Sequence, residues 1–176
     1  AVEKGQDLSV SGTSANLAEG TVVTVTLNGK NYTATTAADG TWSLTVPAAD
    51  LTGLGQASYT LNATATNGVG NSISTTANLL VDTALPTVTI NTVAGDNVIN
   101  AAEVAAGQTL SGTVANAEAG NTVTVAIGGH SYTATVQNNL SWSVNVPSDV
   151  LTALGNGSLS VTATVNNGHG NTGTGE

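Results

Sequence analysis

The sequence repeats itself at an offset of 100 residues. Residues 11–47, SGTSANLAEGTVVTVTLNGKNYTATTAADGTWSLTVP, align without a gap with residues 111–147, SGTVANAEAGNTVTVAIGGHSYTATVQNNLSWSVNVP. The match continues from LTGLG to LTALG and from NGVGN to NGHGN. Self-similarity of this kind indicates two copies of one folding unit, so the same fold must form twice within 176 residues.

Each copy consists of short stretches with an apolar residue at every second position, as expected for strands with one buried face. NTVTVAIGG buries Val123, Val125 and Ile127, and its Gly-Gly pair is typical of a tight hairpin. GTWSLTV and LSWSVNV place Trp42 and Trp142 on the inward faces of equivalent strands. A proline then opens a short helical turn in each copy, and we expect the leucines of these turns to pack against the core (Leu51, Leu54, Leu151 and Leu154).

The spacing of strands and turns indicates the fold class. About seven short strands per copy, with turn signals every 8–12 residues, are typical of an immunoglobulin-like sandwich. The chain contains no Cys, so the resemblance to antibody domains is one of architecture only. We predict an all-β protein of tandem immunoglobulin-like β-sandwich domains. Residues 1–82 are expected to form an N-terminally truncated repeat, 83–86 a linker, and 87–176 a repeat that lacks its last strand.

Composition excludes several functions. Eleven acidic residues oppose two lysines, and the net charge is −9. Such a chain cannot replace the counterions of a nucleic acid, and no apolar run is long enough for direct membrane insertion. The only histidines, His130 and His169, have Lys30 and Val69 as counterparts in the other copy. Neither position suggests a catalytic base, and no phosphate-binding loop is present, so we expect no enzyme activity.

Three acidic residues fall in or near the segment where the copies join. The segment VDTALPTVTINTVAGDNVINAAE contains Asp82, Asp96, Asn100 and Glu103, and Glu3 is the first-copy counterpart of Glu103. Calcium prefers six to eight oxygen ligands from carboxylates, amides and carbonyls. Carboxylates without a cationic partner repel one another, and a bound divalent cation reverses that interaction. The alternative is that Asp and Asn here cap turns and face water.

The phrases VDTALPTVTINTVAGDNVINAAE, LSGTVANAEAGNTVTVAIGG, YTATV, WSVNVP and NGHGNTGTGE resemble bacterial Ig-like repeats of giant adhesins exported by type I secretion, of the biofilm-associated-protein class. The resemblance implies a structural stalk or spacer segment at the bacterial cell surface, with a role in adhesion and biofilm formation. It also implies Ca²⁺ at the domain junctions. Its implied ligands are Asp82, Asp96, Asn100 and Glu103, with Glu3 in the first copy.

The resemblance implies two kinds of partner: neighbouring repeats of the same chain, and like chains on other cells. An alternative function is a module that binds a glycan or a host protein through its loops. Exposed aromatic platforms would favour that alternative, and apart from the two tryptophans the only aromatic residues are Tyr32, Tyr59 and Tyr132.

Overall fold

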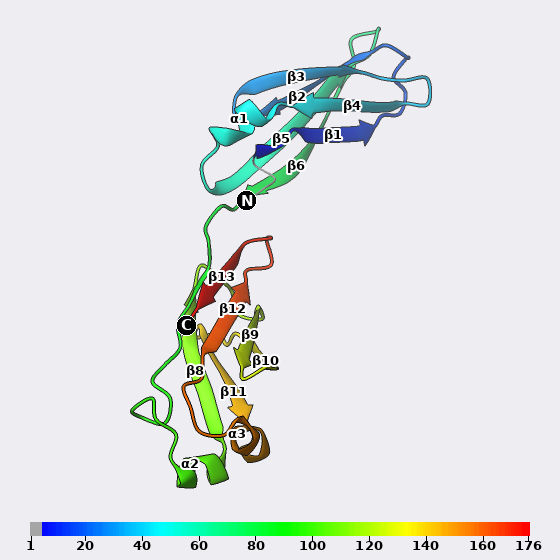
Figure 1. Ribbon diagram of the computed structural model, residues 1–176. Coiled ribbons are helices and arrows are strands. Elements are labelled where there is room, and N and C mark those ends of the chain that lie inside the picture. The colour runs from blue at the N-terminus through cyan, green and yellow to red at the C-terminus, as the bar shows by residue number, and fades with distance from the viewer. Residues whose placement is uncertain (1–4) are drawn as a thin grey trace. The chain divides into compact units, whose positions relative to one another are not determined.

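The chain forms two compact units, Ala1–Thr83 (unit 1) and Ala84–Glu176 (unit 2), in a computed structural model that describes residues 5–176. Both units are sandwiches of antiparallel strands with one or two short helices (Figure 1). The all-β immunoglobulin-like fold predicted from the repeat is therefore confirmed. The division between the units falls inside the segment 83–86.

Unit 1 has a two-stranded sheet, β1-β4, that faces a four-stranded sheet, β3-β2-β5-β6. The long hairpin of β5 and β6 pairs over ten residues, from Ala57 opposite Val81 to Thr66 opposite Ser72. The elements are β1 (Leu8–Thr13), β2 (Val22–Leu27), β3 (Lys30–Thr35), β4 (Thr41–Val46), α1 (Ala48–Thr52), β5 (Ala57–Thr66) and β6 (Ser72–Val81).

Unit 2 repeats this topology with additions. Its sheets are β11-β8-β7 and β10-β9-β12-β13, so that β7 supplies a third strand beside β8. The elements are β7 (Thr87–Val88), α2 (Ala101–Ala106), β8 (Gln108–Ala115), β9 (Thr122–Ile127), β10 (His130–Thr135), β11 (Ser141–Val146), α3 (Ser148–Leu154), β12 (Val161–Asn166) and β13 (Thr172–Gly175).

Alternation along the strands builds a separate core in each unit. Trp42 is 9% exposed and Trp142 is 1% exposed, as predicted from their places in β4 and β11. The glycine opposite each tryptophan makes room for its ring, because a Cβ at Gly12 would lie 2.5 Å from the indole of Trp42. At Gly112 a Cβ would lie 1.8 Å from the carbonyl oxygen of Thr89 as well as 2.8 Å from the Trp142 ring.

The helical turns predicted after Pro47 and Pro147 are present as α1 and α3. Their leucines pack against the core: Leu51, Leu54 and Leu151 are buried, and Leu154 is partly buried. The hairpin signals are also confirmed, because Asn28 and Gly29 both have positive φ, +49° and +78°, which a two-residue hairpin turn with a right-handed strand twist requires.

The segment between β7 and β8 is only partly a loop. Its second half forms α2, which contacts α3. The sequence carried a signal for this helix, because Asn-x-x-Glu at 100–103 is the pattern of a capping box. The same Asn and Glu oxygens that suit a metal ion therefore also form a helix cap.

The chain passes from one end of unit 2 to the other. Thr87 pairs with Ala115, at the end of β8 remote from α2, and β8 spans about 25 Å at ~3.3 Å per residue. The last strand, β13, runs from Thr172 towards the end where α2 and α3 lie, because Gly175 pairs with Ala163 near the start of β12. The α2–α3 end of unit 2 therefore carries the predicted ligand segment.

Candidate metal-binding segment and the helical ends of the sandwiches

The segment 91–100 is a series of tight turns. Asp96 accepts a hydrogen bond from the backbone N–H of Val98 (2.9 Å), and the Asn97 side chain accepts one from the N–H of Val93 (2.9 Å). Asn97 itself has a φ of +66°, a left-handed conformation that Asn tolerates better than most residues. The Asp96 carboxylate, a predicted metal ligand, thus also holds the backbone of the turn.

Asn100 and Glu103 are brought together at the start of α2. The Asn100 side-chain oxygen accepts from the N–H groups of Ala102 and Glu103, and Glu103 Oε2 accepts from the N–H of Asn100 at 2.8 Å. This reciprocal arrangement is a capping box, which satisfies backbone donors that the first turn of a helix leaves unpaired. Both side chains therefore have a structural role in unit 2 whether or not they bind an ion.

The other two predicted ligands lie elsewhere. Asp82 belongs to unit 1, where it follows the last residue of β6 and is half-buried. Glu3 lies outside the residues that the structure describes. The structure consequently brings Asn100 and Glu103 into contact, keeps Asp96 in the same segment, and places Asp82 in the other unit.

The donor chemistry of the segment suits a hard cation, since Asp96, Asn97, Asn100 and Glu103 all offer side-chain oxygens. These side chains alone do not form a complete calcium site. Between residues 5 and 176, no three His, Cys, Asp or Glu side chains are grouped so that they could hold a metal ion. The described residues of this segment could supply part of a calcium coordination sphere, and further oxygens would have to come from elsewhere.

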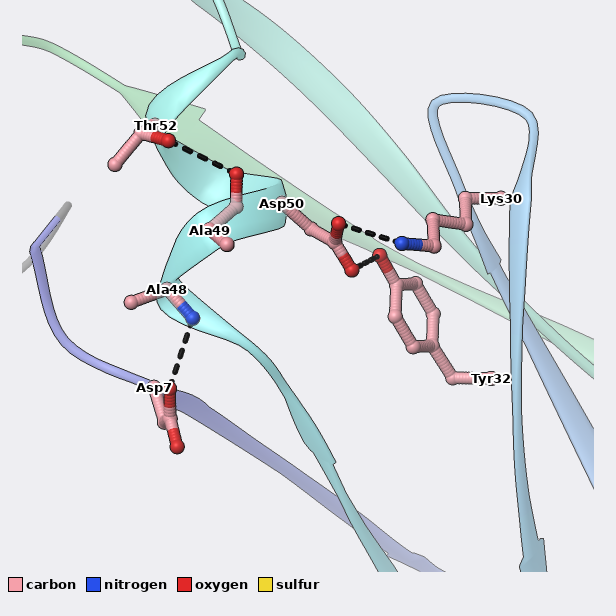
Figure 2. Close-up of polar contacts among 7 residues, drawn as sticks. All are labelled: Asp7, Lys30, Tyr32, Ala48, Ala49, Asp50 and Thr52. Atoms are coloured by element: carbon pink, nitrogen blue, oxygen red, sulfur yellow. Dashed lines mark hydrogen bonds and ion pairs between the residues drawn. The ribbon is translucent and has the colours of Figure 1, made fainter.

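At the corresponding helical end of unit 1, a carboxylate is paired with a cation. Asp50 of α1 points towards β3, where its two oxygens accept hydrogen bonds from Lys30 Nζ at 2.5 Å and from the Tyr32 hydroxyl at 2.9 Å (Figure 2). Asp7 also reaches α1, and accepts from the N–H of Ala48 at 2.8 Å (Figure 2). These acids tie α1 to neighbouring strands.

Electrostatics follow this geometry. The hydrogen bond from Lys30, together with that from Tyr32, holds the pKa of Asp50 below its usual value. Partial burial raises the pKa of Tyr32, and its hydrogen bond to the Asp50 carboxylate acts in the same direction, because the proton is held between the two oxygens.

At one pair of equivalent turns, the two copies use different polar residues to make the same hydrogen bonds. Asp39 accepts from both the N–H and the hydroxyl of Thr41, and the hydroxyl bond lowers the pKa of Asp39. Asn139 makes the same two hydrogen bonds with Ser141. An amide oxygen can therefore replace the carboxylate here, which assigns this position a role in the turn.

The geometry defines two consecutive immunoglobulin-like β-sandwiches. Residues 8–83 match the family model of the bacterial Ig-like domain, and unit 2 repeats that sequence pattern at an offset of 100 residues. The chain belongs to the bacterial Ig-like domain family, a non-enzymatic kind of domain.

Two solved structures are similar to nearly the whole chain. One is a Ca²⁺-stabilized adhesin that helps an Antarctic bacterium to reach out and bind ice, with 34% identity over 99% of this chain and 44% of that chain, at a TM-score of 0.56. The other is a 1.5-MDa bacterial ice-binding adhesin, studied for its retention at the host cell surface, with 30% identity over 99% of this chain and 56% of that chain, at a TM-score of 0.58.

The chain spans about half the length of these two solved chains, at 44% and 56%. No curated protein sequence matches it significantly. Among the described helices, none is long and apolar enough to cross a membrane. The relatives of the chain are thus Ig-like repeats of large bacterial adhesins.

Proposed function

We propose that the chain is a stalk or spacer segment of a large bacterial surface adhesin. In this role it extends the protein away from the cell surface, in the extracellular space, after export by type I secretion, and contributes to cell adhesion and biofilm formation. It has no enzymatic function. Its partners are neighbouring repeats of the same chain and like chains on other cells.

The observation that carries this proposal is the path of the chain through unit 2. Thr87 lies at one end of the sandwich, and β13 runs towards the opposite end. Repeats with that path add length with each copy, and their stability is a sum of local contributions. The acidic surface, at a net charge of −9, limits association between similar sandwich edges.

Calcium is the second part of the proposal. Asp96, Asn100 and Glu103 would bind the ion at the α2–α3 end of a repeat, and Glu3 with Asp82 at the equivalent end of the first copy. The similar adhesin described as Ca²⁺-stabilized supports this assignment. The ion would neutralise carboxylates that otherwise repel one another and would stiffen the joint between repeats. Extracellular modules bind calcium at about 10⁻⁴–10⁻³ M.

Calorimetry and small-angle scattering of the 176-residue chain test the calcium assignment. We expect heat on calcium addition, and a longer, stiffer particle with calcium than with excess chelator, while both cores stay folded. Asp82→Asn and Asp96→Asn should each reduce the binding heat. These positions are preferable to Asn100 and Glu103, whose substitution would also disrupt the capping box.

The matched control is Asp149→Asn, since Asp149 is an exposed acid in the first turn of α3 that is not a predicted ligand. It should bind calcium as the unmodified chain does. Absence of binding heat, together with scattering that does not change with calcium, would rule out the metal joint. An Asp82→Asn variant that unfolds unit 1 would show that this acid is part of the fold.

The alternative of a glycan- or host-protein-binding module receives no support from the aromatic residues. Both tryptophans are buried, and Tyr32, Tyr59 and Tyr132 are half-buried and pack against the cores. A glycan array probed with the full chain separates the two functions, because a spacer should give no specific signal on it.

A further inference from the structure

The acidic residues of the chain are confined to its loops, helices and flanking segments. Within residues 5–176, every acidic side chain lies outside the strands, and the only basic strand residues are Lys30 and His130, each directly after a hairpin turn. The acids concerned are Asp7, Glu19, Asp39, Asp50, Asp82, Asp96, Glu103, Glu118, Asp149 and Glu176. The outward faces of the described sheets are therefore free of acids, although the chain has a net charge of −9.

The larger outward face of unit 1 is a regular array of hydroxyl and amide side chains. It is the solvent side of the sheet β3-β2-β5-β6, and we call it the wide face. Its paired rows are Thr33-Thr24-Thr64-Ser74 and Asn31-Thr26-Asn62-Thr76, extended by the pairs Thr35-Val22, Thr66-Ser72, Thr60-Asn78 and Ser58-Leu80. Its two apolar members, Val22 and Leu80, are 53% and 54% exposed, so that a partner on this face would also cover apolar surface.

Unit 2 presents the same chemistry on the outward side of β10-β9-β12-β13, its own wide face. The rows there are Thr133-Thr124-Thr164-Thr174, Thr135-Thr122-Asn166-Thr172 and Ser131-Ala126-Thr162. Where the two copies differ on this face, one uncharged residue replaces another, as Thr162 replaces Asn62. The uncharged array is thus a property of both units.

Hydrogen bonds within the wide face order some of its side chains. The Thr26 hydroxyl donates to Asn31 Oδ1 on the neighbouring strand at 2.7 Å. The hydroxyls of Thr66 and Ser72 are hydrogen-bonded to each other at 2.8 Å. Short side chains that are already ordered lose little conformational entropy when a partner covers them, which favours the use of this face as a contact surface.

We propose that like chains associate side by side through their wide faces, an inference that rests on the proposed partnership between adhesin molecules. Two chains that each carry a net charge of −9 repel one another wherever their acids approach. Contact through the wide faces keeps the acids out of the interface. Hydroxyl and amide groups both donate and accept hydrogen bonds, so the face is complementary to a second copy of itself, as a two-fold interface requires.

The size of the wide face fits a weak contact. In unit 1 its two longest strands, β5 and β6, have ten residues each. With ~4.8 Å between strands and ~3.3 Å per residue, the four strands cover about 500 Å² on each partner, which is in the range of transient interfaces. The outward side of β1-β4, with six paired positions, covers less than about half of that area. Each repeat of a tandem array adds another wide face, so weak contacts between long chains sum to a higher avidity.

The test is a series of NMR spectra of the ¹⁵N-labelled full chain at concentrations up to about 1 mM. Excess chelator is present throughout, so that the result does not depend on the calcium proposal. We expect chemical shifts that change with concentration at the outward residues of both wide faces, together with slower tumbling. Shifts that do not change, or that change only in the loops, would overturn the inference. The spacer role is measured separately, as particle length by scattering, and would stand after such a result.

Two matched double variants locate the contact. Asn62→Lys with Thr162→Lys places a cation on each wide face, and contact between two copies then brings like charges together. The association should therefore weaken about ten-fold or more. Ser43→Lys with Ser143→Lys adds the same charge to the outward sides of β4 and β11 and should change the affinity by no more than about two-fold. Association driven by overall charge alone would strengthen in both variants, and that outcome would overturn the inference.

Salt and a neutral polysaccharide provide tests on the unmodified chain. High salt screens the repulsion between acids and should tighten the association. Weakening by salt would place ion pairs at the contact and overturn the inference. Dextran that shifts the wide-face residues of a chain that does not self-associate would assign these faces to a glycan partner, and would also overturn it.

Discussion

The two units share a repeated sequence but differ in the strands that the described residues supply. In unit 2, β7 adds a third strand beside β8, and the N–H groups of Thr89 and Asn91 continue this pairing to Thr113 and Ser111. In unit 1, within the described residues, β1 pairs only with β4. The tryptophans reflect this difference, at 1% exposure in unit 2 and 9% in unit 1. The repeat forms the core, and the segment that flanks it completes the burial.

The same contrast appears in the loop shared as NGVGN and NGHGN. Asn67 and Asn167 each accept backbone hydrogen bonds within this loop. Asn167 and Asn171 are buried, at 3% and 1% exposure, whereas Asn71 is exposed. Next to this loop, the segment that leads into β7 lies close to β13, because a Cβ at Gly173 would lie 1.8 Å from the Pro86 carbonyl oxygen.

At the helical ends the difference is one of chemistry. Unit 1 joins Lys30, Tyr32 and Asp50 by hydrogen bonds, whereas unit 2 has Val150 in place of Asp50 and packs it against the core. α2 then lies against α3. One scaffold thus stabilises its helix either by a polar cluster or by apolar packing.

Replacing the tryptophans should change the stability of the two units more than any other substitution below. Trp142→Ala should lower the unfolding free energy of unit 2 by about 3–5 kcal/mol. Trp42→Ala should cost unit 1 less, because the Trp42 ring is less completely covered. Urea unfolding monitored by far-UV circular dichroism measures both, with Val69→Ala at an 84% exposed position as the control. An equal loss in the two units would contradict a role of β7 in completing the core.

A smaller effect is expected at the turn before β4 and β11. Leu140 has a φ of +62°, where unit 1 has Gly40 at +80°. The left-handed conformation costs a residue with a Cβ about 1–2 kcal/mol, so Leu140→Gly should stabilise unit 2 by about 1 kcal/mol. Gly40→Leu should instead destabilise unit 1, because a Cβ there would lie 2.4 Å from the Ser14 carbonyl oxygen. Unfolding midpoints of the two variants check this, and destabilisation by both would count against it.

The smallest expected effect is the contribution of Asp50 to the stability of unit 1 at low pH. Because the pKa of Asp50 is lowered in the folded state, its contribution to stability is complete above the unfolded-state pKa near 4. It is lost as the pH falls below that value and through the lowered folded-state pKa. The melting temperature of unit 1 should therefore fall less between about pH 5 and pH 2 in Asp50→Asn than in the unmodified chain.

The contribution of Asp50 should also weaken at high salt, as for other exposed ion pairs. Unit 2 has Val150 at this position and serves as an internal control within the same sample. An acid response of unit 1 that Asp50→Asn leaves unchanged would assign the acid sensitivity to other carboxylates.

Much of the fold could be predicted from the sequence, because its signals are local. Alternation along GTWSLTV and LSWSVNV placed both tryptophans in the core, and Asn28-Gly29 placed a hairpin, since side-chain period and turn chemistry depend on adjacent residues. The repeat also indicated that the same sandwich forms twice. In the candidate metal segment, the sequence showed that Asp96, Asn100 and Glu103 fall within one short stretch.

Only the tertiary structure decided what each acidic or amide side chain contacts. Asn100 and Glu103 cap α2, and Asp50 pairs with Lys30 across twenty residues of sequence. The requirement for glycine at Gly112 was equally hidden, because it depends on Thr89 of another strand and on the Trp142 ring. Contacts between distant segments depend on how strands pack in three dimensions, and no pattern within a single strand specifies which neighbour will cover it.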